Sequence, residues 1–320
     1  MTSNSSTTSS NQQKELPHEK VVILGSGPAG LAAALYAARA ELQPLVISGI
    51  ELGGQAALTH TIENYPGFPD GVGGPELGEL FQKQAERFGA RVEFSTATAV
   101  DLSKQPFLIT TDSKKLLSDS LIIATGATPN HLNVPGEKAL IGKGVSYCAT
   151  CDGWFFKEKH VAIVGGGDSA LEEALFLTRY AASVKIIHRR DALRAGAILQ
   201  KRAKEHPKIS FVWNSVVEEI KGETAITSLL LKNTLSGEKT NLPVDGLFIF
   251  IGHTPNTAMF KNQLEMDDLG FIKANMLMET SVAGVFAAGE VADSHFRQVI
   301  TSAGMGAAAA IQATHFLEKE

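Results

Sequence analysis

The feature that most constrains this chain is a local pattern that occurs twice. In the first copy, a short β-branched run at residues 21–24 stops at Gly-Ser-Gly-Pro-Ala-Gly (25–30). A stretch rich in Ala and Leu follows at 31–40 and predicts a helix, and residues 45–48 predict a second strand. Strand, G-x-G-x-x-G turn, helix and strand in this order are typical of a dinucleotide-binding unit.

The second copy begins 140 residues after the first. Residues 161–164 predict a strand, Gly-Gly-Gly-Asp-Ser-Ala (165–170) the turn, 171–180 the helix and 184–187 the next strand. Ala170 stands at the third glycine position, which is an accepted variant of this fingerprint. Two intact copies predict an α/β chain that binds two nucleotides.

The glycines have separate roles in such a turn. Gly25 permits the tight turn, Gly27 lets the backbone approach a pyrophosphate, and Gly30 lets helix and strand pack closely. The helix then presents free N–H groups and partial positive charge to the phosphates. A G-x-G-x-x-G turn alone can be a tight turn without a ligand, but the flanking strand and helix favour a nucleotide site.

The ends of the two second strands differ. The second copy ends in His188-Arg189-Arg190, with Arg194 one turn further on. Guanidinium groups pair bidentately with phosphate, so this cluster indicates the 2′-phosphate of NADPH; the alternative is a solvated basic start to a helix. The first copy has no basic cluster, and Glu51 is equally consistent with a ribose ligand and with a surface glutamate.

Two further fragments favour a flavin in the first unit. Residues 120–126 predict a buried strand that runs into Gly126, and residues 284–288 predict another that ends in Gly289-Glu290. An acidic side chain at such a strand end can hold a ribityl hydroxyl. The small side chains of residues 303–310 suit a helix that lies tightly against a sheet or a flat ring, and simple helix packing explains them equally well.

The only two cysteines are Cys148 and Cys151, in a C-x-x-C pair. A zinc site needs two more soft ligands, and His160 does not match a finger spacing, so no metal site is expected. Beside two nucleotide units, the pair indicates redox chemistry through a disulfide. Asp152 follows directly and can supply the proton that a leaving thiolate needs, although a helix-capping role is the alternative.

Composition excludes several classes of protein. Net charge is −5, without a run of Lys or Arg that fits nucleic acid, and no apolar stretch approaches the ~20 residues that span a bilayer. Residues 1–19 are dominated by Ser, Thr, Asn and Gln and predict a disordered tail without the apolar core of a signal peptide. We therefore expect a cytoplasmic protein.

From about residue 20 to its end, the chain resembles the low-molecular-weight thioredoxin reductases. The matching motifs are GSGPAG, GGQ, IENYPGFP, ATGA, CATCDG, GGGDSALEEAL, HRRDALRA, IGHTPN and RQVITSAG. The resemblance implies FAD, NADPH, a homodimer and thioredoxin as the protein substrate.

The resemblance also assigns residues to sites. It implies Cys148, Cys151 and Asp152 as the redox centre. FAD would be held by Gly25, Ser26, Gly27, Pro28, Ala29, Gly30, Gly53, Gly54, Gln55, Asn64, Gly126, Gly289, Glu290, Arg297, Gln298 and Val299. NADPH would be held by Gly167, Asp168, Ser169, His188, Arg189, Arg190 and Arg194.

Three positions depart from the family pattern. Glu290 replaces an aspartate, so one extra methylene must be accommodated beside the flavin. Phe296 replaces a frequent tyrosine, and Ala283 replaces a frequent proline. None of these changes removes a chemical group that the reaction needs.

The predicted fold is α/β, with two three-layer, Rossmann-like domains. The FAD domain is expected to comprise residues 20–129 and 257–320, with the NADPH domain and its cysteine pair inserted at 130–256. Because nicotinamide and disulfide must both reach one flavin, the inserted domain is expected to rotate on hinges near 128–133 and 253–256.

The predicted function is transfer of electrons from NADPH through FAD and the disulfide to oxidised thioredoxin. One alternative keeps this chemistry but reduces another small protein disulfide, of a peroxiredoxin or a glutaredoxin-like protein. A second alternative is a flavin-containing sensor without turnover. The arginine cluster argues against the sensor, which has little use for a phosphate-selective NADPH site.

Overall fold

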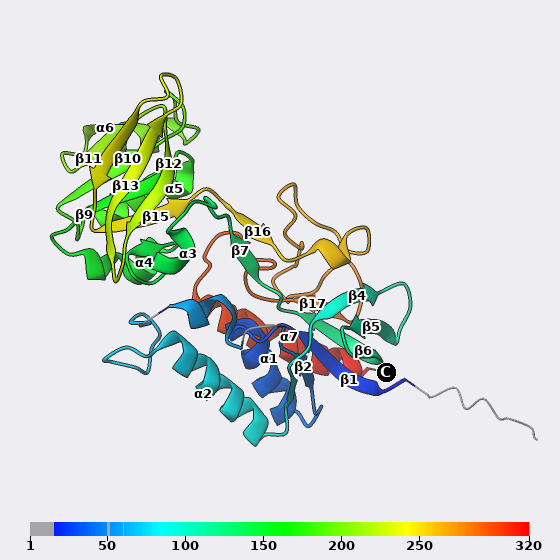
Figure 1. Ribbon diagram of the computed structural model, residues 1–320. Helices are drawn as coiled ribbons and strands as arrows, with labels where there is room; N and C mark the ends of the chain where they lie inside the picture. Colours follow the sequence, from blue (N-terminus) through cyan, green and yellow to red (C-terminus); the bar gives the residue numbers. More distant parts are fainter. Residues whose placement is uncertain (1–15, 50–51, 60, 320) are drawn as a thin grey trace, which may run out of the picture.

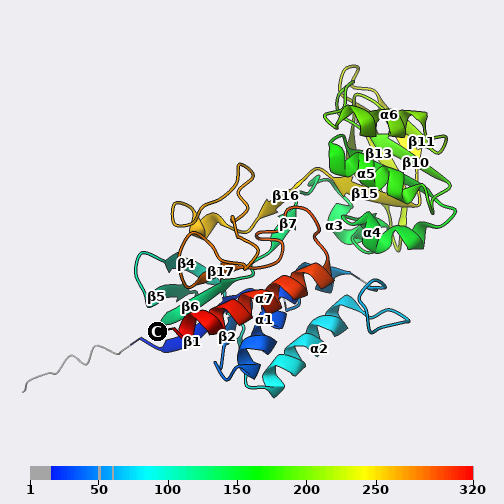
Figure 2. The same ribbon diagram turned by 180° about the vertical axis from the view of Figure 1, so that it is seen from behind.

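The computed structural model describes residues 16–49, 52–59 and 61–319. Figures 1 and 2 show two units, joined by a narrow ribbon of two strands, β7 (Ala127–Pro129) and β16 (His253–Pro255). The residues before β7 and those after β16 form the first unit. The residues between these two strands form the second, inserted unit. The prediction of an α/β fold with two Rossmann-like units, one inserted in the other, is confirmed.

The first unit is built on one mixed sheet. Its strand order in the described residues is β3 (Arg91–Glu93), β2 (Leu45–Ile47), β1 (His18–Leu24), β6 (Lys115–Ile123), β5 (Phe107–Thr111) and β4 (Ala97–Asp101), and β17 (Val285–Ala287) also pairs with β6. The strands β1, β2, β3, β6 and β17 run parallel, whereas β4 and β5 pair antiparallel. Since β17 comes from the last part of the chain, this sheet is complete only when both ends of the sequence are present.

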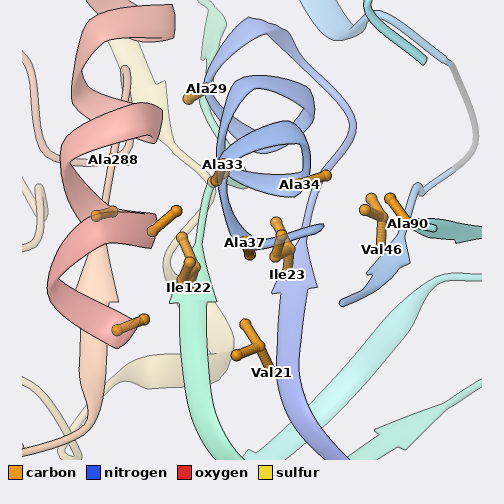
Figure 3. Close-up of a cluster of buried hydrophobic side chains, with 14 of the residues drawn as sticks. Val21, Ile23, Ala29, Ala33, Ala34, Ala37, Val46, Ala90, Ile122 and Ala288 are labelled. Atoms are coloured by element: carbon orange, nitrogen blue, oxygen red, sulfur yellow. The ribbon is translucent and has the colours of Figure 1, made fainter. Parts of the chain in front are cut away.

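Both faces of this sheet are buried, which explains the uninterrupted apolar run in β1. Val21 and Ile23 pack under α1 (Pro28–Arg39) and α7 (Val299–Leu317), as Figure 3 shows for α1. Their neighbours on β1 face the opposite side, where η3 (Ala258–Phe260) contributes a fully buried Phe260. Parallel strands buried on both faces read as continuous apolar sequence rather than as an alternation.

Helix α7 lies very close to α1, as the small residues at 303–310 suggested. A Cβ on Gly306 would lie 2.0 Å from the carbonyl oxygen of Ala29. Helix α2 (Gly74–Arg87) also contacts α1, and η1 (Gly54–Leu58) adjoins α2. Of the two roles considered for this stretch, the described contacts are those of helix packing.

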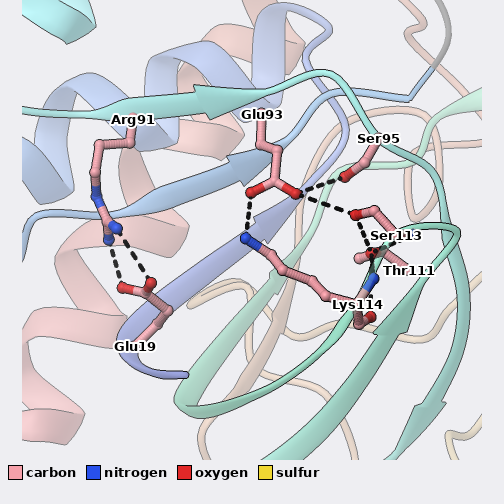
Figure 4. Close-up of polar contacts among 7 residues, drawn as sticks. All are labelled: Glu19, Arg91, Glu93, Ser95, Thr111, Ser113 and Lys114. Carbon is pink, nitrogen blue, oxygen red and sulfur yellow. Dashed lines mark hydrogen bonds and ion pairs between the residues drawn. The ribbon is translucent and has the colours of Figure 1, made fainter. Parts of the chain in front are cut away.

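Strand β1 begins earlier than the sequence suggested. His18 and Glu19, assigned above to the tail, pair with Leu117 and Ser118 of β6, so that boundary was two residues too late. Figure 4 shows that Glu19 also forms an ion pair with Arg91. The rest of the predicted tail, residues 1–15, and Glu51 lie outside the described residues.

The inserted unit is built on a fully parallel sheet. Its order is β11 (Ile209–Val212), β10 (Ser183–Ile187), β9 (His160–Gly165), β15 (Gly246–Phe250) and β8 (Val145–Ser146). Helices α5 (Asp168–Leu177) and α6 (Ala197–Glu205) cover one face. The antiparallel sheet of β12 (Ser215–Gly222), β13 (Ile226–Asn233) and β14 (Lys239–Pro243) covers the other. Three short helices, α3 (Glu137–Leu140), α4 (Ala149–Asp152) and η2 (Gly153–Phe156), complete the unit.

Polar contacts outside the core tie the edges of the first sheet. Figure 4 shows Glu93 of β3 between Lys114 and Ser95, with Lys114 Nζ 2.5 Å from the Glu93 carboxylate. These groups are partly exposed, and such pairs contribute little to stability. The described residues contain no helix with the length and apolarity needed to cross a membrane.

Candidate active site

The first glycine turn has the geometry that its sequence predicts. A Cβ on Gly25 would lie 2.2 Å from the carbonyl oxygen of Ala124, and one on Gly30 would lie 1.9 Å from that of Gly25. At Gly27 the closest such neighbour is the Cα of Gly54, at 4.0 Å. Gly25 and Gly30 are therefore required by packing, whereas Gly27 keeps open the space in front of the α1 N-terminus.

This open space belongs to a large cavity of about 1280 Å³. Most residues predicted to hold FAD line it: Gly25, Ser26, Gly27, Pro28, Ala29, Gly54, Gln55, Asn64, Gly126, Gly289, Glu290, Arg297, Gln298 and Val299. Gly30 and Gly53 do not line it, but Gly53 donates a backbone hydrogen bond of 3.0 Å to Ser26 and so fixes the cavity wall. The volume, the helix N-terminus and the open glycine fit a dinucleotide cofactor.

The two cysteines line the same cavity and are joined in a disulfide, as predicted. Their Cα atoms are 5.3 Å apart, and Cys148 immediately precedes the single turn of α4 that carries Cys151. The Sγ of Cys148 accepts a hydrogen bond of 3.2 Å from the backbone N–H of Cys151. The inserted unit thus places its disulfide against the residues predicted to hold the flavin.

Asp152, which directly follows Cys151 at the end of α4, also lines the cavity. Burial raises the pKa of its carboxyl, and a hydrogen bond from the Ser146 hydroxyl opposes that shift. A raised pKa lets a carboxyl group keep its proton to higher pH, and a protonated carboxyl group can deliver that proton to a sulfur.

Arg297 brings a positive charge to the same cavity. Its guanidinium donates to Nδ1 of His253 over 2.6 Å, because arginine has no acceptor, and this contact requires that nitrogen to be unprotonated. Burial, assisted by the Arg297 charge, lowers the pKa of His253 to about 4. Burial raises the pKa values of Glu173 and Glu290 to about 7, while Arg297 pulls both downward.

Glu173 carries a second indication that a ligand belongs here. Its Oε2 is buried and has no hydrogen-bond partner among the described residues, although the residue lines the cavity. Leaving a buried polar atom unpaired is costly, so an absent donor in the cavity accounts for it. The residues present therefore fit a bound cofactor that carries polar groups.

The second glycine turn repeats the geometry of the first. A Cβ on Gly165 would lie 2.6 Å from the Ala170 Cβ, whereas nothing lies within 4 Å of one on Gly167. The carboxylate of Asp168 accepts a 2.7 Å hydrogen bond from the Gly196 N–H, which anchors the loop after Arg194. Ser169, the second residue of α5, is the only residue of the predicted NADPH set that lines the large cavity.

The arginine cluster lies outside this cavity. Arg189, Arg190 and Arg194 are exposed at the end of β10, and none forms an ion pair within the described ranges. His188 differs from them because its ring is buried and both its nitrogens lie 3.0 Å from carbonyl oxygens, of Gly165 and Ala192. It therefore joins the glycine turn to the arginine loop rather than facing solvent with the arginines.

Ser146, Thr150 and Glu173 line the cavity although no role was predicted for them, and His253, expected only in a hinge, lines it as well. His253 and Glu173 lie inside motifs that carried the family resemblance, and Thr150 lies between the two cysteines. Their positions in these motifs were the available signal. The directions of their side chains depend on how the two units pack together. That packing cannot be predicted from the local sequence.

Comparison with known proteins agrees with this geometry. Residues 19–306 match the family described as pyridine nucleotide-disulphide oxidoreductase. The chain is 50% identical over 300 residues to a thioredoxin reductase of Streptomyces coelicolor, covering 93% of each protein. It is similar to a crystal structure of Streptococcus pyogenes thioredoxin reductase, with a TM-score of 0.91 at 40% identity over 96% of this chain and 100% of that one.

A third comparison concerns the placement of the two units relative to each other. Lactococcus lactis thioredoxin reductase in its FR conformation is 42% identical, over 94% of this chain and 100% of that one, yet the TM-score is 0.65. Identity is as high as for the Streptococcus protein, so the lower score does not come from sequence divergence. From its motifs, its cavity and these relatives, the chain belongs to the pyridine nucleotide-disulphide oxidoreductases and, within them, to the low-molecular-weight thioredoxin reductases.

Proposed function

We propose that this protein reduces the disulfide of a thioredoxin with electrons from NADPH, through bound FAD and the Cys148–Cys151 pair. The observation that carries the proposal is the position of this disulfide in one cavity with the first glycine turn. When bound, FAD accepts hydride from NADPH and supplies two electrons to the disulfide. The chain's own residues bind the two cofactors, orient the disulfide and supply a proton to a sulfur.

The FAD site proposed is the large cavity of the first unit. The N–H groups of residues at the α1 N-terminus would hold the pyrophosphate, where Gly27 leaves space. Glu290, three residues beyond the end of β17, lines the cavity and would hold a ribityl hydroxyl; its raised pKa allows it to donate as well as accept a hydrogen bond. Gln55, Asn64, Arg297, Gln298 and Val299 also line this cavity and would complete the site.

The NADPH site proposed lies at the carboxyl ends of β9 and β10. Gly167, Asp168 and Ser169 would present the α5 N-terminus to the pyrophosphate. Arg189, Arg190 and Arg194 are exposed and free to pair with a 2′-phosphate, while His188 holds their loop against the glycine turn. The preference for NADPH over NADH follows from these charges.

Two arrangements of the units are part of the proposal. In the arrangement described, the cysteine pair lines the flavin cavity and the arginine cluster lies outside it. Nicotinamide must reach the same flavin, so the inserted unit must turn on the β7–β16 ribbon. The two TM-scores, 0.91 and 0.65 at similar identity, support a fold that exists in two arrangements.

The remaining assignments follow from family membership. We propose a homodimer, action in the cytoplasm, an FAD domain of residues 20–129 and 257–320, and an NADPH domain of 130–256. Light scattering of the purified chain tests the dimer.

Steady-state oxidation of NADPH tests the acceptor. The purified protein should be yellow, with about one FAD per chain, and should oxidise NADPH rapidly only when a thioredoxin disulfide is present. Peroxiredoxin and glutaredoxin-like disulfides serve as matched acceptors. If turnover were faster with one of these acceptors, that acceptor rather than thioredoxin would be the substrate. Absence of turnover with all three would favour a sensor.

A further inference from the structure

A line of hydrogen bonds runs from the first unit to the disulfide. Asn64 Nδ2 lies 3.1 Å from Gln298 Oε1, and Gln298 Nε2 lies 3.3 Å from the hydroxyl of Thr150. The Thr150 Oγ1 lies in turn 3.3 Å from Sγ of Cys148. Asn64 and Gln298 belong to the first unit, whereas Thr150 and Cys148 belong to the inserted unit, so the line crosses between them.

The chemistry of each group fixes the direction of the last two bonds. A disulfide sulfur carries no hydrogen, so the Thr150 hydroxyl donates to Cys148 Sγ. That hydroxyl has one hydrogen, so it must accept from the amide of Gln298.

The orientation of the Gln298 amide is fixed independently. Gln298 is the N-cap of α7, and its backbone N–H donates to the Thr301 hydroxyl. Its nitrogen faces the carbonyl oxygens of Phe296 and Arg297, at 3.3 and 3.1 Å, which accept only from N–H. The amide nitrogen therefore points to Thr150, and every bond in the line donates toward Cys148.

We propose that Thr150 is a positioning residue that stabilises negative charge on Cys148 when the disulfide opens. As two electrons enter, the S–S bond breaks and each sulfur gains one electron and becomes a thiolate; Asp152 can supply a proton to one of them. Cys148 Sγ then has two donors, the Thr150 hydroxyl and the Cys151 N–H. Hydrogen bonds to a charged acceptor are stronger than those to a neutral one, and donors in a line polarise one another.

The proposal ties the reactivity of the thiol to the arrangement of the units. While the disulfide faces the first unit, Gln298 polarises the Thr150 hydroxyl and the thiolate is most stabilised. If the inserted unit turns, as the proposed function requires, Thr150 keeps its bond to the sulfur but loses Gln298. The thiolate of Cys148 is then more basic, and a more basic thiolate is the better nucleophile toward a protein disulfide.

Other titratable groups act on the same sulfur and must stay constant in a test. Asp152 follows Cys151 on α4, Glu173 lies on α5, which packs against α4, and Tyr147 precedes Cys148. Glu290 and Arg297 line the same cavity from the first unit. Substitutions at Thr150 leave all five unchanged.

The experiment measures the apparent pKa of Cys148 in the FAD-bound C151S protein, from the pH dependence of its alkylation by iodoacetamide. T150V removes the hydroxyl, and we expect the pKa to rise by about half a unit to one unit, or about three- to tenfold less thiolate below that pKa. T150S retains the hydroxyl and should restore the parent value. An unchanged pKa in T150V, or an equal rise in T150S, would overturn the proposal.

A second arm tests the contact between units. Q298L should raise the same pKa by a smaller amount, and T150V combined with Q298L should add nothing beyond T150V, because Gln298 acts through Thr150. Additive shifts would show that Gln298 acts by another route and would overturn the coupling. Because alkylation needs neither NADPH nor thioredoxin, its outcome is independent of the acceptor assay above.

Discussion

The hydroxyl of Ser146 lies 2.5 Å from the Asp152 carboxylate and holds that group beside the disulfide. The same hydroxyl accepts a 3.1 Å hydrogen bond from the Cys148 N–H, so one side chain fixes both the acid and the cysteine loop. Ser146 ends β8, the edge strand of the inserted sheet, and its position is therefore set by the core of that unit.

Replacement of Asp152 by asparagine should slow electron transfer to the acceptor without preventing reduction of the flavin. Asparagine keeps the shape but cannot deliver a proton, and general acids of this kind typically contribute about 10²–10⁴-fold. Stopped-flow measurement of flavin bleaching by NADPH and turnover with thioredoxin separates the two steps. Equal losses in both would assign Asp152 a structural role.

Replacement of either cysteine by serine should abolish reduction of a protein disulfide but preserve reduction of the flavin. The relay needs both sulfurs, whereas hydride transfer from NADPH involves neither. Flavin bleaching in C148S and C151S is the measurement. If neither variant bleached, the disulfide would be holding the site together instead of carrying electrons.

Neutralising Arg189 and Arg190 should remove most of the preference for NADPH. Each charge-assisted contact with a phosphate is worth about 1.5–3 kcal/mol, so the double variant R189Q/R190Q should lose at least tenfold in the ratio of kcat/KM for NADPH and NADH. R202Q on the exposed face of α6 is the matched control. A wild-type ratio in the double variant would exclude the cluster as the discriminator.

Alanine substitutions should distinguish the glycines that the fold needs from those that the ligand needs. G27A meets no close neighbour, so the cofactor-free protein should fold normally but bind FAD more weakly. G30A places a Cβ 1.9 Å from the Gly25 carbonyl oxygen and should lower Tm sharply. Thermal unfolding and FAD titration of both variants are the measurements; equal Tm losses would show that Gly27 is also structural.

Glu290 should make the cofactor-free protein less stable as pH rises. Burial raises the folded-state pKa from 4.5 to about 7, so the folded protein binds the extra proton and loses stability between these values, by up to roughly 3 kcal/mol. E290Q mimics the protonated form, so its Tm should match wild type near pH 5 and exceed it near pH 8. E238Q on an exposed turn is the control. A Tm difference independent of pH would contradict the assignment.

Much of this architecture could be predicted because the decisive signals are local. Close backbone contacts require glycine at fixed positions, such as Gly25 and Gly30, and this spacing is visible in the sequence. The apolar run at 21–24 indicates a strand that is buried on both faces. The cysteine pair is three residues apart, so its bond needs no information from the rest of the chain. The tail boundary failed because His18 and Glu19 are polar residues whose partners, in β6 and at Arg91 and Asp119, lie far along the chain.

The contacts between the units were not predictable in this way. Thr150 and Gln298 are separated by 148 positions, and nothing in CATCDG or RQVITSAG states that they meet. His188 shows the same limit, because its motif suggested a phosphate ligand while its ring is buried between two backbone carbonyls. The directions of these side chains depend on how distant parts of the chain pack together in the folded protein.

The position of the insertion has a consequence for synthesis of the chain on the ribosome. The inserted unit is complete once residue 255 has emerged, and domains generally fold as units while they are made. The first unit must wait, because β17 and α7 come last and α7 covers the helix that follows the first glycine turn. A nascent chain therefore contains a complete inserted unit before the first unit can fold, and a chain that ends before α7 lacks the helix that packs against α1.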